Sequence, residues 1–185
     1  MRGYFGIGVE GISKEQNVGT IARSAHSFGA SFFFTIDPAV DVLALRSSDT
    51  SDAFDHLPYY QYDSADKLDL PKDCTLIGVE FVEESVPLPS FRHPLRAAYI
   101  LGPEMGNLSP EIMERCEHIV KIPMKFCVNV GVAAAIIMYD RMICLGKFAE
   151  RPVRPGAVLN PPSAKKHQAS TLRRKLRKPK KSAEN

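Results

Sequence analysis

The sequence of 185 residues lacks the long apolar run that a membrane-spanning helix requires. Such a helix needs about 18 or more consecutive apolar residues, whereas the longest run here, Val130–Met138, has nine with its glycine included. Gly6, Gly8 and Glu10 interrupt the N-terminal segment, which therefore lacks the apolar centre of a secretory signal. From these absences we expect a cytosolic protein without a membrane segment.

Cysteine is scarce, and its spacing does not indicate a site. The four cysteines are Cys74, Cys116, Cys127 and Cys144, and no two of them form a C-x-x-C pair. The five histidines do not combine with them at the spacing of zinc ligands either. We therefore expect reduced, mostly buried thiols, with neither a disulfide framework nor a bound metal.

Acidic residues are almost missing from the C-terminal end. Residues 163–185 carry nine Lys and Arg side chains against Glu184 alone, a net charge of +8, which leaves −5 for residues 1–162 out of the total of +3. Four prolines between residues 152 and 162 precede this basic segment, which has few apolar residues with which to build a core. We expect one domain over residues 1–150 and, over residues 151–185, a proline-containing linker with a flexible basic tail that contacts a polyanion.

The rest of the sequence alternates between strand and helix patterns. Apolar runs predict strands over residues 4–9, 31–36, 59–62, 75–81, 97–101 and 118–122. Helices are predicted over residues 15–28, from Ser109 onward and over 129–147, with a short one near 64–68 and an exposed connection at 86–89. Gly29 is placed like a C-cap glycine, and Ser109 like an N-cap residue before Pro110. This alternation predicts an α/β domain with a mainly parallel sheet flanked by helices.

The last predicted helix is apolar on nearly every side. A helix of this kind has to be covered on more than one face. Two arrangements satisfy this requirement: a central core helix, or a helix shared between the core and a second copy of the chain.

Three segments carry residue types suited to chemistry. The first is N-x-G-x-x-x-R with a following F-G, which includes Asn17 and Arg23; the second is L-G-P-E-x-G-x-L, which includes Glu104; the third is I-P-M followed by N-V-x-V-A-A-A-I, which includes Asn129. Each also has an ordinary reading, since Arg23 could simply face solvent and Asn129 could simply cap a helix. The second segment, which has glycines on both sides of Glu104, matches neither the consensus for dinucleotide binding nor the consensus for phosphate binding.

Taken together and in this order, the three segments resemble the SpoU (TrmH-like) family of SPOUT-class RNA methyltransferases over about residues 4–148. The resemblance implies a C-terminal deep trefoil knot, although folds in general avoid knots. It also implies a homodimer through the knot region and the last helix. The implied activity is transfer of a methyl group from S-adenosyl-L-methionine to a ribose 2′-hydroxyl of tRNA or rRNA.

The same resemblance implies the site residues. Arg23 is the leading catalytic residue, supported by Asn17, Glu104 and Asn129. Because an Arg side chain is a poor general base, Arg23 would either act with a neighbouring phosphate or cofactor carboxylate, or position a phosphate and stabilise the developing alkoxide. Expected cofactor contacts are Val79, Glu80, Gly102, Ile122, Met124, Cys127 and Val128. Expected RNA contacts are Arg23 and, from the tail, Lys165, Lys166, Arg173, Arg174, Lys175, Arg177 and Lys178.

The sequence departs from the family pattern in two places. Cys127 stands where the family usually has Ser, and the loop between Met124 and Asn129 is shortened. Cys127 and the basic tail leave open a non-catalytic RNA-binding or ribosome-assembly protein of the same fold. Because the wider SPOUT class includes enzymes that act on a base, a base methyltransferase also stays open. No DNA partner is expected, and neither the RNA nor the modified nucleotide follows from the sequence.

Overall fold

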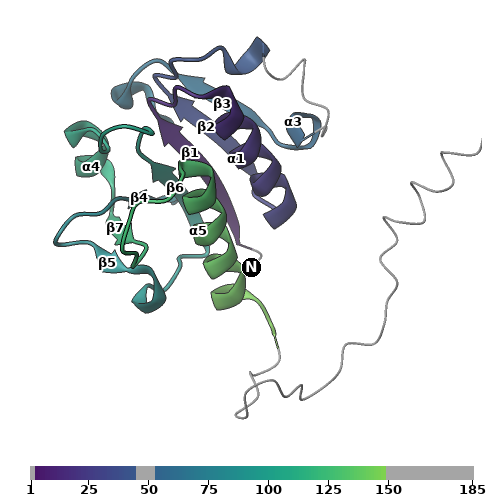
Figure 1. Cartoon of the computed structure of the whole chain (residues 1–185). Helices are drawn as coiled ribbons and strands as arrows, with labels where there is room; N and C mark the ends of the chain where they lie inside the picture. Colours follow the sequence, from purple (N-terminus) through teal and green to yellow (C-terminus); the bar gives the residue numbers. More distant parts are fainter. Residues whose placement is uncertain (1–2, 45–52, 149–185) are drawn as a thin grey trace, which may run out of the picture. The chain divides into compact units, whose positions relative to one another are not determined.

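The computed structural model describes residues 3–44 and 53–148 (Figure 1). Within these residues, seven strands form one sheet in the order β3-β2-β1-β6-β4-β7-β5. Every pair of neighbouring strands is parallel, as the alternating sequence pattern predicts. The strands are β1 (Tyr4–Glu10), β2 (Phe32–Ile36), β3 (Tyr59–Tyr62), β4 (Thr75–Val79), β5 (Val86–Pro87), β6 (Arg96–Leu101) and β7 (His118–Lys121).

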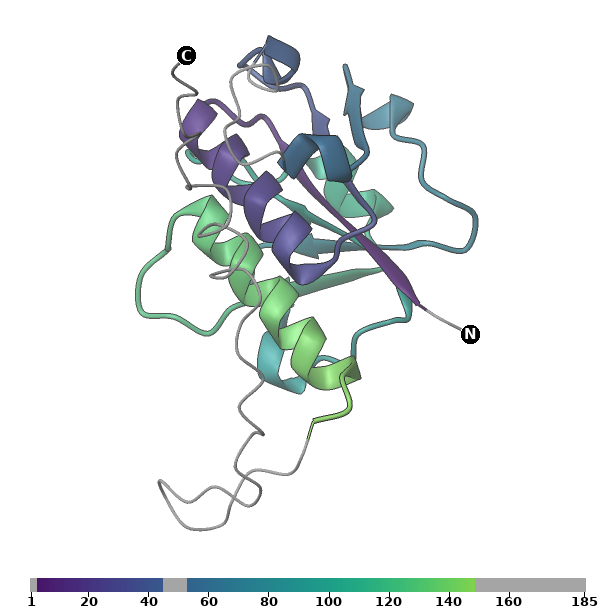
Figure 2. The same cartoon turned by 90° about the vertical axis from the view of Figure 1, so that its right-hand side faces the viewer.

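Helices cover both faces of this sheet. Helices α1 (Glu15–Phe28) and α5 (Val130–Leu145) pack side by side on one face, which is turned toward the viewer in Figure 2. Helix α4 (Pro110–Arg115) and the short turn η1 (Ala65–Lys67) lie on the other face. Helix α3 (Ala53–His56) packs beside α1, and the turn η2 (Leu88–Ser90) follows β5. None of the helices described is long and apolar enough to cross a membrane.

Alternating side chains of each strand enter different cores. On β2, Phe33 is buried beneath α1, whereas Phe32 and Phe34 are buried on the side of α4. Tyr99 of β6 points to the first core and its neighbour Ile100 to the second. Because both faces are covered, these strands have nearly continuous apolar sequences instead of an alternation of apolar and polar residues.

Two glycines of β1 make room for the aromatic rings of β2. A Cβ atom added at Gly6 would lie 2.2 Å from the ring of Phe32, and one added at Gly8 would lie 2.2 Å from the ring of Phe34. The two rings therefore lie over the backbone of the neighbouring strand. Side chains at these two positions would overpack the core on the α4 side of the sheet.

The predicted helix ends are confirmed. Helix α1 covers residues 15–28, and Gly29 adopts a left-handed backbone with φ of 75°, donating its N–H toward Ala25 and His26. The Ser109 hydroxyl accepts a hydrogen bond from the Ile112 N–H at 3.2 Å, and Pro110 is the first helical residue. Glycine suits the first position because it adopts the left-handed backbone without strain, and serine suits the second because its hydroxyl satisfies a backbone N–H that the helix leaves unpaired.

The exposed connection predicted at residues 86–89 is wrong in part. Val86 and Pro87 are exposed, but they form the edge strand β5 beside β7, and Leu88 is only 3% exposed. Proline is compatible with an edge strand because its missing N–H faces away from the sheet. The strand predicted over 75–81 ends at Val79, and the one over 118–122 ends at Lys121.

Within residues 3–44 and 53–148, helix α5 is covered on one face. Ala134, Ile137 and Met138 are buried against the sheet and α1. The opposite side carries a stripe of apolar residues that stay accessible: Val132, Ala135, Ile136, Tyr139, Met142 and Ile143. The described residues therefore do not meet the prediction that the helix is covered on more than one face. The predicted tail residues lie outside the described residues.

Candidate functional site

A cavity of about 430 Å³ lies at the carboxyl ends of three neighbouring strands. Its walls come from the segments that follow β4, β6 and β7 and from the first turn of α5. In open parallel sheets this edge is where ligands bind, and the volume is in the usual range for a small-molecule site.

All seven residues expected to contact the cofactor line this cavity. They are Val79, Glu80, Gly102, Ile122, Met124, Cys127 and Val128. Glu104 and Asn129, two of the expected catalytic residues, line it as well. At Gly102 a Cβ atom would lie 3.0 Å from the Leu108 nitrogen, so glycine lets the loop fold tightly here. Loops that are 15 and 20 positions apart in the sequence thus meet at one place.

Glu104 joins the loop after β6 to the start of α1. One of its carboxylate oxygens accepts from the backbone N–H of Ser13 at 3.0 Å and from the Ser13 hydroxyl at 2.9 Å. The other oxygen accepts from the Lys14 N–H at 3.1 Å and from the Asn17 amide at 2.7 Å. With four donors around it, this carboxylate acts as an anchor between two segments of the cavity wall.

These hydrogen bonds also favour the charged form of Glu104. Partial burial alone would raise the pKa of this carboxyl group, but the hydrogen bonds from Asn17 and Ser13 outweigh burial and lower the pKa below its usual value. Glu104 is therefore a carboxylate at neutral pH and a poor source of protons.

Asn17 connects the first and third sequence segments. Its side chain is 5% exposed, donates to Glu104, and accepts from the Asn129 amide at 2.8 Å. Asn129 also accepts from the Gly131 N–H at 2.8 Å and so caps α5. Since an amide carries two N–H donors and only one of Asn129 is used here, Asn129 retains a donor beside the cavity. The capping and ligand-binding interpretations of Asn129 are thus compatible.

Two further carboxylates support the same loop, and one of them was missed from the sequence. Glu10, at the end of β1, accepts from the Ser109 N–H at 2.8 Å, and Glu80 accepts from the Leu108 N–H at 2.9 Å. Glu80 was expected to contact the cofactor, but one of its oxygens bonds Leu108 and the other the Phe81 N–H at 2.8 Å. The sequence feature that could have identified Glu10 is its position, as a carboxylate, at the end of a buried strand.

Arg23 lies on the exposed side of α1 and is not among the residues that line the cavity. It is six residues beyond Asn17, which corresponds to a rotation of about 120° around the helix. No hydrogen bond within the described residues joins its guanidinium to Glu104, Asn129 or Asn17. Its expected catalytic role stays a prediction.

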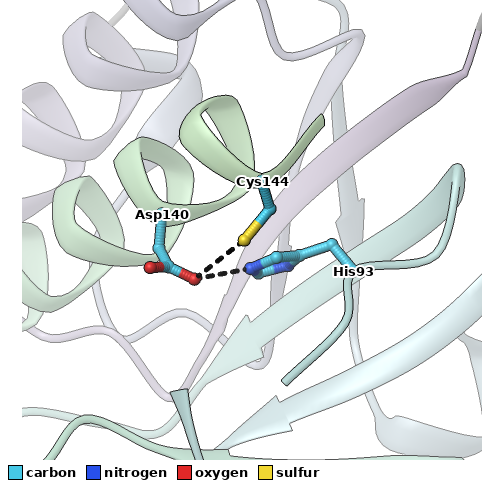
Figure 3. Close-up of side chains that lie close together, drawn as sticks. All are labelled: His93, Asp140 and Cys144. Carbon is cyan, nitrogen blue, oxygen red and sulfur yellow. Dashed lines mark hydrogen bonds and ion pairs between the residues drawn. The ribbon is translucent and has the colours of Figure 1, made fainter. Parts of the chain in front are cut away.

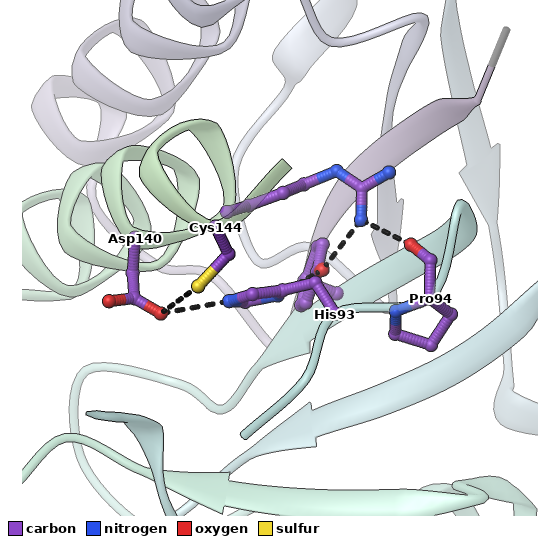
Figure 4. Close-up of polar contacts among 6 residues, drawn as sticks. His93, Pro94, Asp140 and Cys144 are labelled. Atoms are coloured by element: carbon purple, nitrogen blue, oxygen red, sulfur yellow. Dashed lines mark hydrogen bonds and ion pairs between the residues drawn. The ribbon is translucent and has the colours of Figure 1, made fainter. Parts of the chain in front are cut away.

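A second polar network lies at the opposite end of the sheet, where β1 and β6 begin (Figures 3 and 4). The guanidinium of Arg141 is buried and donates to the backbone carbonyls of Tyr4, Pro94 and Leu95 and to the Tyr99 hydroxyl. Figure 4 draws the hydrogen bond to the Pro94 carbonyl. It also lies 5.1 Å from the centre of the Phe5 ring. Sequence analysis did not identify this network, because its members are far apart in the chain.

The hydrogen bonds in this network fix the protonation of His93. Arg141 can only donate, so the Tyr99 oxygen accepts from it at 3.1 Å and donates its own proton to His93 Nδ1 at 2.6 Å. The proton of the neutral ring then lies on Nε2 and is donated to Asp140 at 2.9 Å. Hydrogen bonding therefore accounts for the close approach of His93, Asp140 and Cys144, whose ligand atoms lie within 4.8 Å of one another.

This arrangement predicts that the stability of the protein depends on pH through His93. Burial lowers the pKa of His93 below its usual value, Asp140 partly offsets this effect, and Arg141 adds to it. The unfolded chain therefore binds a proton on this ring near pH 6.5, whereas the folded protein does so only at lower pH. The free energy of unfolding is expected to decrease as the pH falls below about 6.5.

Urea unfolding of the wild type and of His93→Gln at several pH values measures this effect. The variant is expected to be less stable at pH 7.5, because it loses buried hydrogen bonds, but to show a weaker decrease of stability between pH 7 and 5. His118→Gln, which changes an exposed histidine, serves as the control. Parallel pH profiles for the wild type and His93→Gln would contradict the prediction.

Comparison with known proteins gives concordant results. The sequence model of the SpoU rRNA Methylase family matches residues 5–139 of this chain. A 23S rRNA (guanosine-2′-O-)-methyltransferase RlmB from Nitrosomonas europaea is 26% identical over 167 residues, which cover 85% of this chain and 60% of the relative. The chain thus spans about three fifths of the length of that relative.

Solved structures share the fold at lower identity. The SpoU methyltransferase AviRb from Streptomyces viridochromogenes, solved with AdoMet, superimposes with a TM-score of 0.66 at 22% identity and covers 77% of this chain and 58% of that chain. A protein solved in a study of 2-OH methylation of C/U34 on tRNA has a TM-score of 0.65 at 22% identity, with 78% of this chain and 98% of that chain covered. These similarities show the fold.

Proposed function

Because this chain belongs to the SpoU rRNA Methylase family, we propose that it transfers a methyl group from S-adenosyl-L-methionine to a ribose 2′-hydroxyl of tRNA or rRNA. The observation that carries the proposal is the convergence of three separate loops on one cavity beside the hydrogen-bonded residues Asn17, Glu104 and Asn129. RNA methyltransferase names among the relatives support the substrate class. A cytosolic location, as expected from the sequence, is part of this proposal.

The cavity suits a nucleoside cofactor. Its wall includes the apolar side chains of Leu101, Ile122 and Val128, against which a flat base can pack. Lys14 and Lys121 also line it, and a cationic side chain can balance the carboxylate of an amino-acid moiety. The AdoMet complex of the related AviRb supports this choice of ligand. When bound, S-adenosyl-L-methionine supplies an electrophilic methyl group for transfer.

The residues of the chain would position the reacting groups. Glu104 has its oxygens occupied by four donors, so its role is to hold the cavity wall in shape. Asn129 would donate its remaining N–H to a ligand in the cavity. Arg23, exposed on α1, is suited to hold an RNA phosphate and to stabilise the alkoxide that forms as the 2′-hydroxyl loses its proton.

Calorimetry with S-adenosyl-L-methionine, followed by a methyl-transfer assay on unmodified tRNA and rRNA, tests the proposal. The expected product after nuclease digestion is a nucleoside with a 2′-O-methyl ribose, identified by mass spectrometry. A methylated base would support the alternative of a base-modifying enzyme, and failure to bind the cofactor would support a non-catalytic RNA-binding protein. Mapping the 2′-O-methyl sites lost from cellular RNA when the gene is deleted would identify the nucleotide.

The proposal includes a homodimer and a C-terminal knot, both implied by the family resemblance. The accessible stripe of α5 supports the dimer, because Val132 is 47% and Tyr139 is 51% exposed and the stripe contains no charged side chain. The charged residues of this helix, Asp140 and Arg141, bond to His93 and to backbone carbonyls instead. Contiguous apolar surface of this kind marks an interface. A second copy of the chain would complete the burial of the helix.

We expect the wild-type chain of 20.5 kDa to sediment at about 41 kDa, the mass of a dimer. Tyr139→Glu is expected to shift the protein to the monomer, since it places a charge in the apolar stripe. Tyr60→Glu is a matched control, because Tyr60 is also 51% exposed and has an edge-on aromatic contact, to Phe32, like that of Tyr139 to Phe28. Equal masses for all three proteins would refute this interface.

A further inference from the structure

The most exposed large apolar side chains of the described residues gather at the cavity. Met105 is 89% exposed, Phe126 is 85% exposed and Phe81 is 63% exposed. Phe81 lines the cavity, Met105 lies between the lining residues Glu104 and Gly106, and Phe126 lies between the lining residues Met124 and Cys127. The cavity loops therefore present apolar groups to solvent as well as to their interior.

Folding does not account for the exposure of Phe126. Its ring packs into neither core cluster, and within residues 3–44 and 53–148 it has no aromatic or cationic partner. Exposing a whole aromatic side chain forgoes the stabilisation that its burial would give. An isolated exposed ring in a loop that lines a ligand cavity is instead available for contact with a ligand.

Three lysines lie at or beside the cavity, whereas the exposed carboxylates of Glu83 and Glu84 follow Phe81 in the chain. Lys14 and Lys121 line the cavity, and Lys125 is exposed next to Phe126. The nearby carboxylates of Glu80 and Glu104 are already hydrogen-bonded to backbone and side-chain donors of the cavity wall. The Lys121 ammonium already donates to the backbone carbonyls of Val82 and Glu83. A ligand that approaches the loops of Met105 and Phe126 therefore meets apolar groups beside the ammonium groups of Lys14 and Lys125.

Lys14 is not explained by the stability of α1. It occupies the N-cap position without a side-chain capping bond, whereas Ser, Thr, Asp or Asn is preferred there. A cation near the N-terminus of a helix is also unfavourable because of the helix dipole. The backbone of Lys14 is bonded to Glu104, so the ammonium group is carried by a fixed segment of the cavity wall.

We propose that Phe126 and Met105 form a stacking platform for a base of the RNA substrate, and that Lys14 and Lys125 bind the phosphates that flank this base. The inference rests on the proposed function, and it assigns base recognition to the rim of the cofactor cavity. Single-stranded RNA combines stackable bases with a negative backbone, which matches this mixture of groups.

The full-length variant Phe126→Ala tests the proposal. In methyl-transfer assays with unmodified tRNA and rRNA, the KM for RNA is expected to rise roughly 5- to 150-fold, the loss that corresponds to removal of one base–aromatic stack. The affinity for S-adenosyl-L-methionine, measured by calorimetry, is expected to stay unchanged. Phe126→Tyr should restore the wild-type KM, since it keeps the ring. Leu95→Ala is the matched control, because Leu95 is 54% exposed and lies before β6, at the end of the sheet opposite to the cavity.

Two direct readouts accompany the kinetics. A single-stranded oligonucleotide that contains 2-aminopurine is expected to lose fluorescence on binding to the wild type but not to Phe126→Ala. Lys125→Gln is expected to reduce the slope of log Kd against log salt by about 0.7, the contribution of one phosphate contact on a single strand.

Other outcomes would overturn the inference. An unchanged KM for Phe126→Ala, in a wild type that does methylate RNA, would refute the platform and leave the proposed function intact. An equal loss of cofactor affinity would assign Phe126 to the cofactor cavity, and a shift from dimer to monomer would assign it to a protein interface. A wild type that binds the cofactor but methylates no ribose would refute the proposed function, and the fluorescence titration would then still test RNA stacking.

Discussion

Arg23→Ala is expected to reduce methyl transfer by about 10²- to 10³-fold, the usual effect of removing one group that stabilises charge in the transition state. The affinity for S-adenosyl-L-methionine is expected to stay within about twofold of the wild type, because Arg23 does not line the cavity. Single-turnover assays and calorimetry measure the two quantities.

Two variants complete this experiment. Arg92→Ala, which removes another exposed arginine, controls for the loss of one positive charge. Arg23→Lys distinguishes charge alone from the paired N–H donors of a guanidinium, and we expect it to recover little activity. If cofactor affinity falls together with activity, Arg23 contributes to the fold or to the cofactor site and not to the reaction.

Glu104→Gln is expected to weaken the binding of S-adenosyl-L-methionine by roughly 10- to 150-fold and to lower methyl transfer at least as much. A neutral amide cannot accept from all four donors around Glu104, and its NH₂ group would face the N–H of either Ser13 or Lys14, depending on its orientation. The cavity wall would then be correctly formed in only a fraction of the molecules, which reduces the apparent affinity by that fraction.

Glu84→Gln, a change of an exposed carboxylate, is the control for this variant. Because the pKa of Glu104 is lowered in the folded protein, its contribution to stability is present above the usual pKa of a glutamate and is lost as the pH falls through the lowered value. Cofactor binding by the wild type is therefore expected to weaken at acidic pH and to become independent of Glu104 there. Cofactor affinity that is equal in Glu104→Gln and the wild type at pH 7.5 would contradict the anchoring role.

The sequence predicted the elements well where the chain alone determines them. Phe32–Ile36 is an almost continuous apolar strand, and Gly29 and Ser109 mark helix ends, because hydrophobic runs and unpaired backbone groups act locally. The short strand Val86–Pro87 was missed, since it pairs with β7, which lies more than 30 residues further along the chain. The order of the strands likewise depends on contacts that no local pattern encodes.

The site could be predicted in its composition but not in its connections. The motif resemblance indicated residues that do line one cavity, including Val79, Gly102 and Ile122. It did not indicate that Glu104 accepts hydrogen bonds from Ser13 and Lys14 or that Glu10 holds the end of the same loop. These bonds link residues about 90 to 100 positions apart, and only the folded arrangement brings them together.

The three carboxylates of Glu10, Glu80 and Glu104 affect how small molecules enter and leave the cavity. They tie the loop of residues 102–109 to β1, β4 and α1, so this side of the cavity is rigid. Within the described chain, no backbone hydrogen bond ties down residues 123–128 on the other side. Binding of the methyl donor and release of its demethylated product should therefore require bending of residues 123–128. The short length of this segment would then limit the turnover rate.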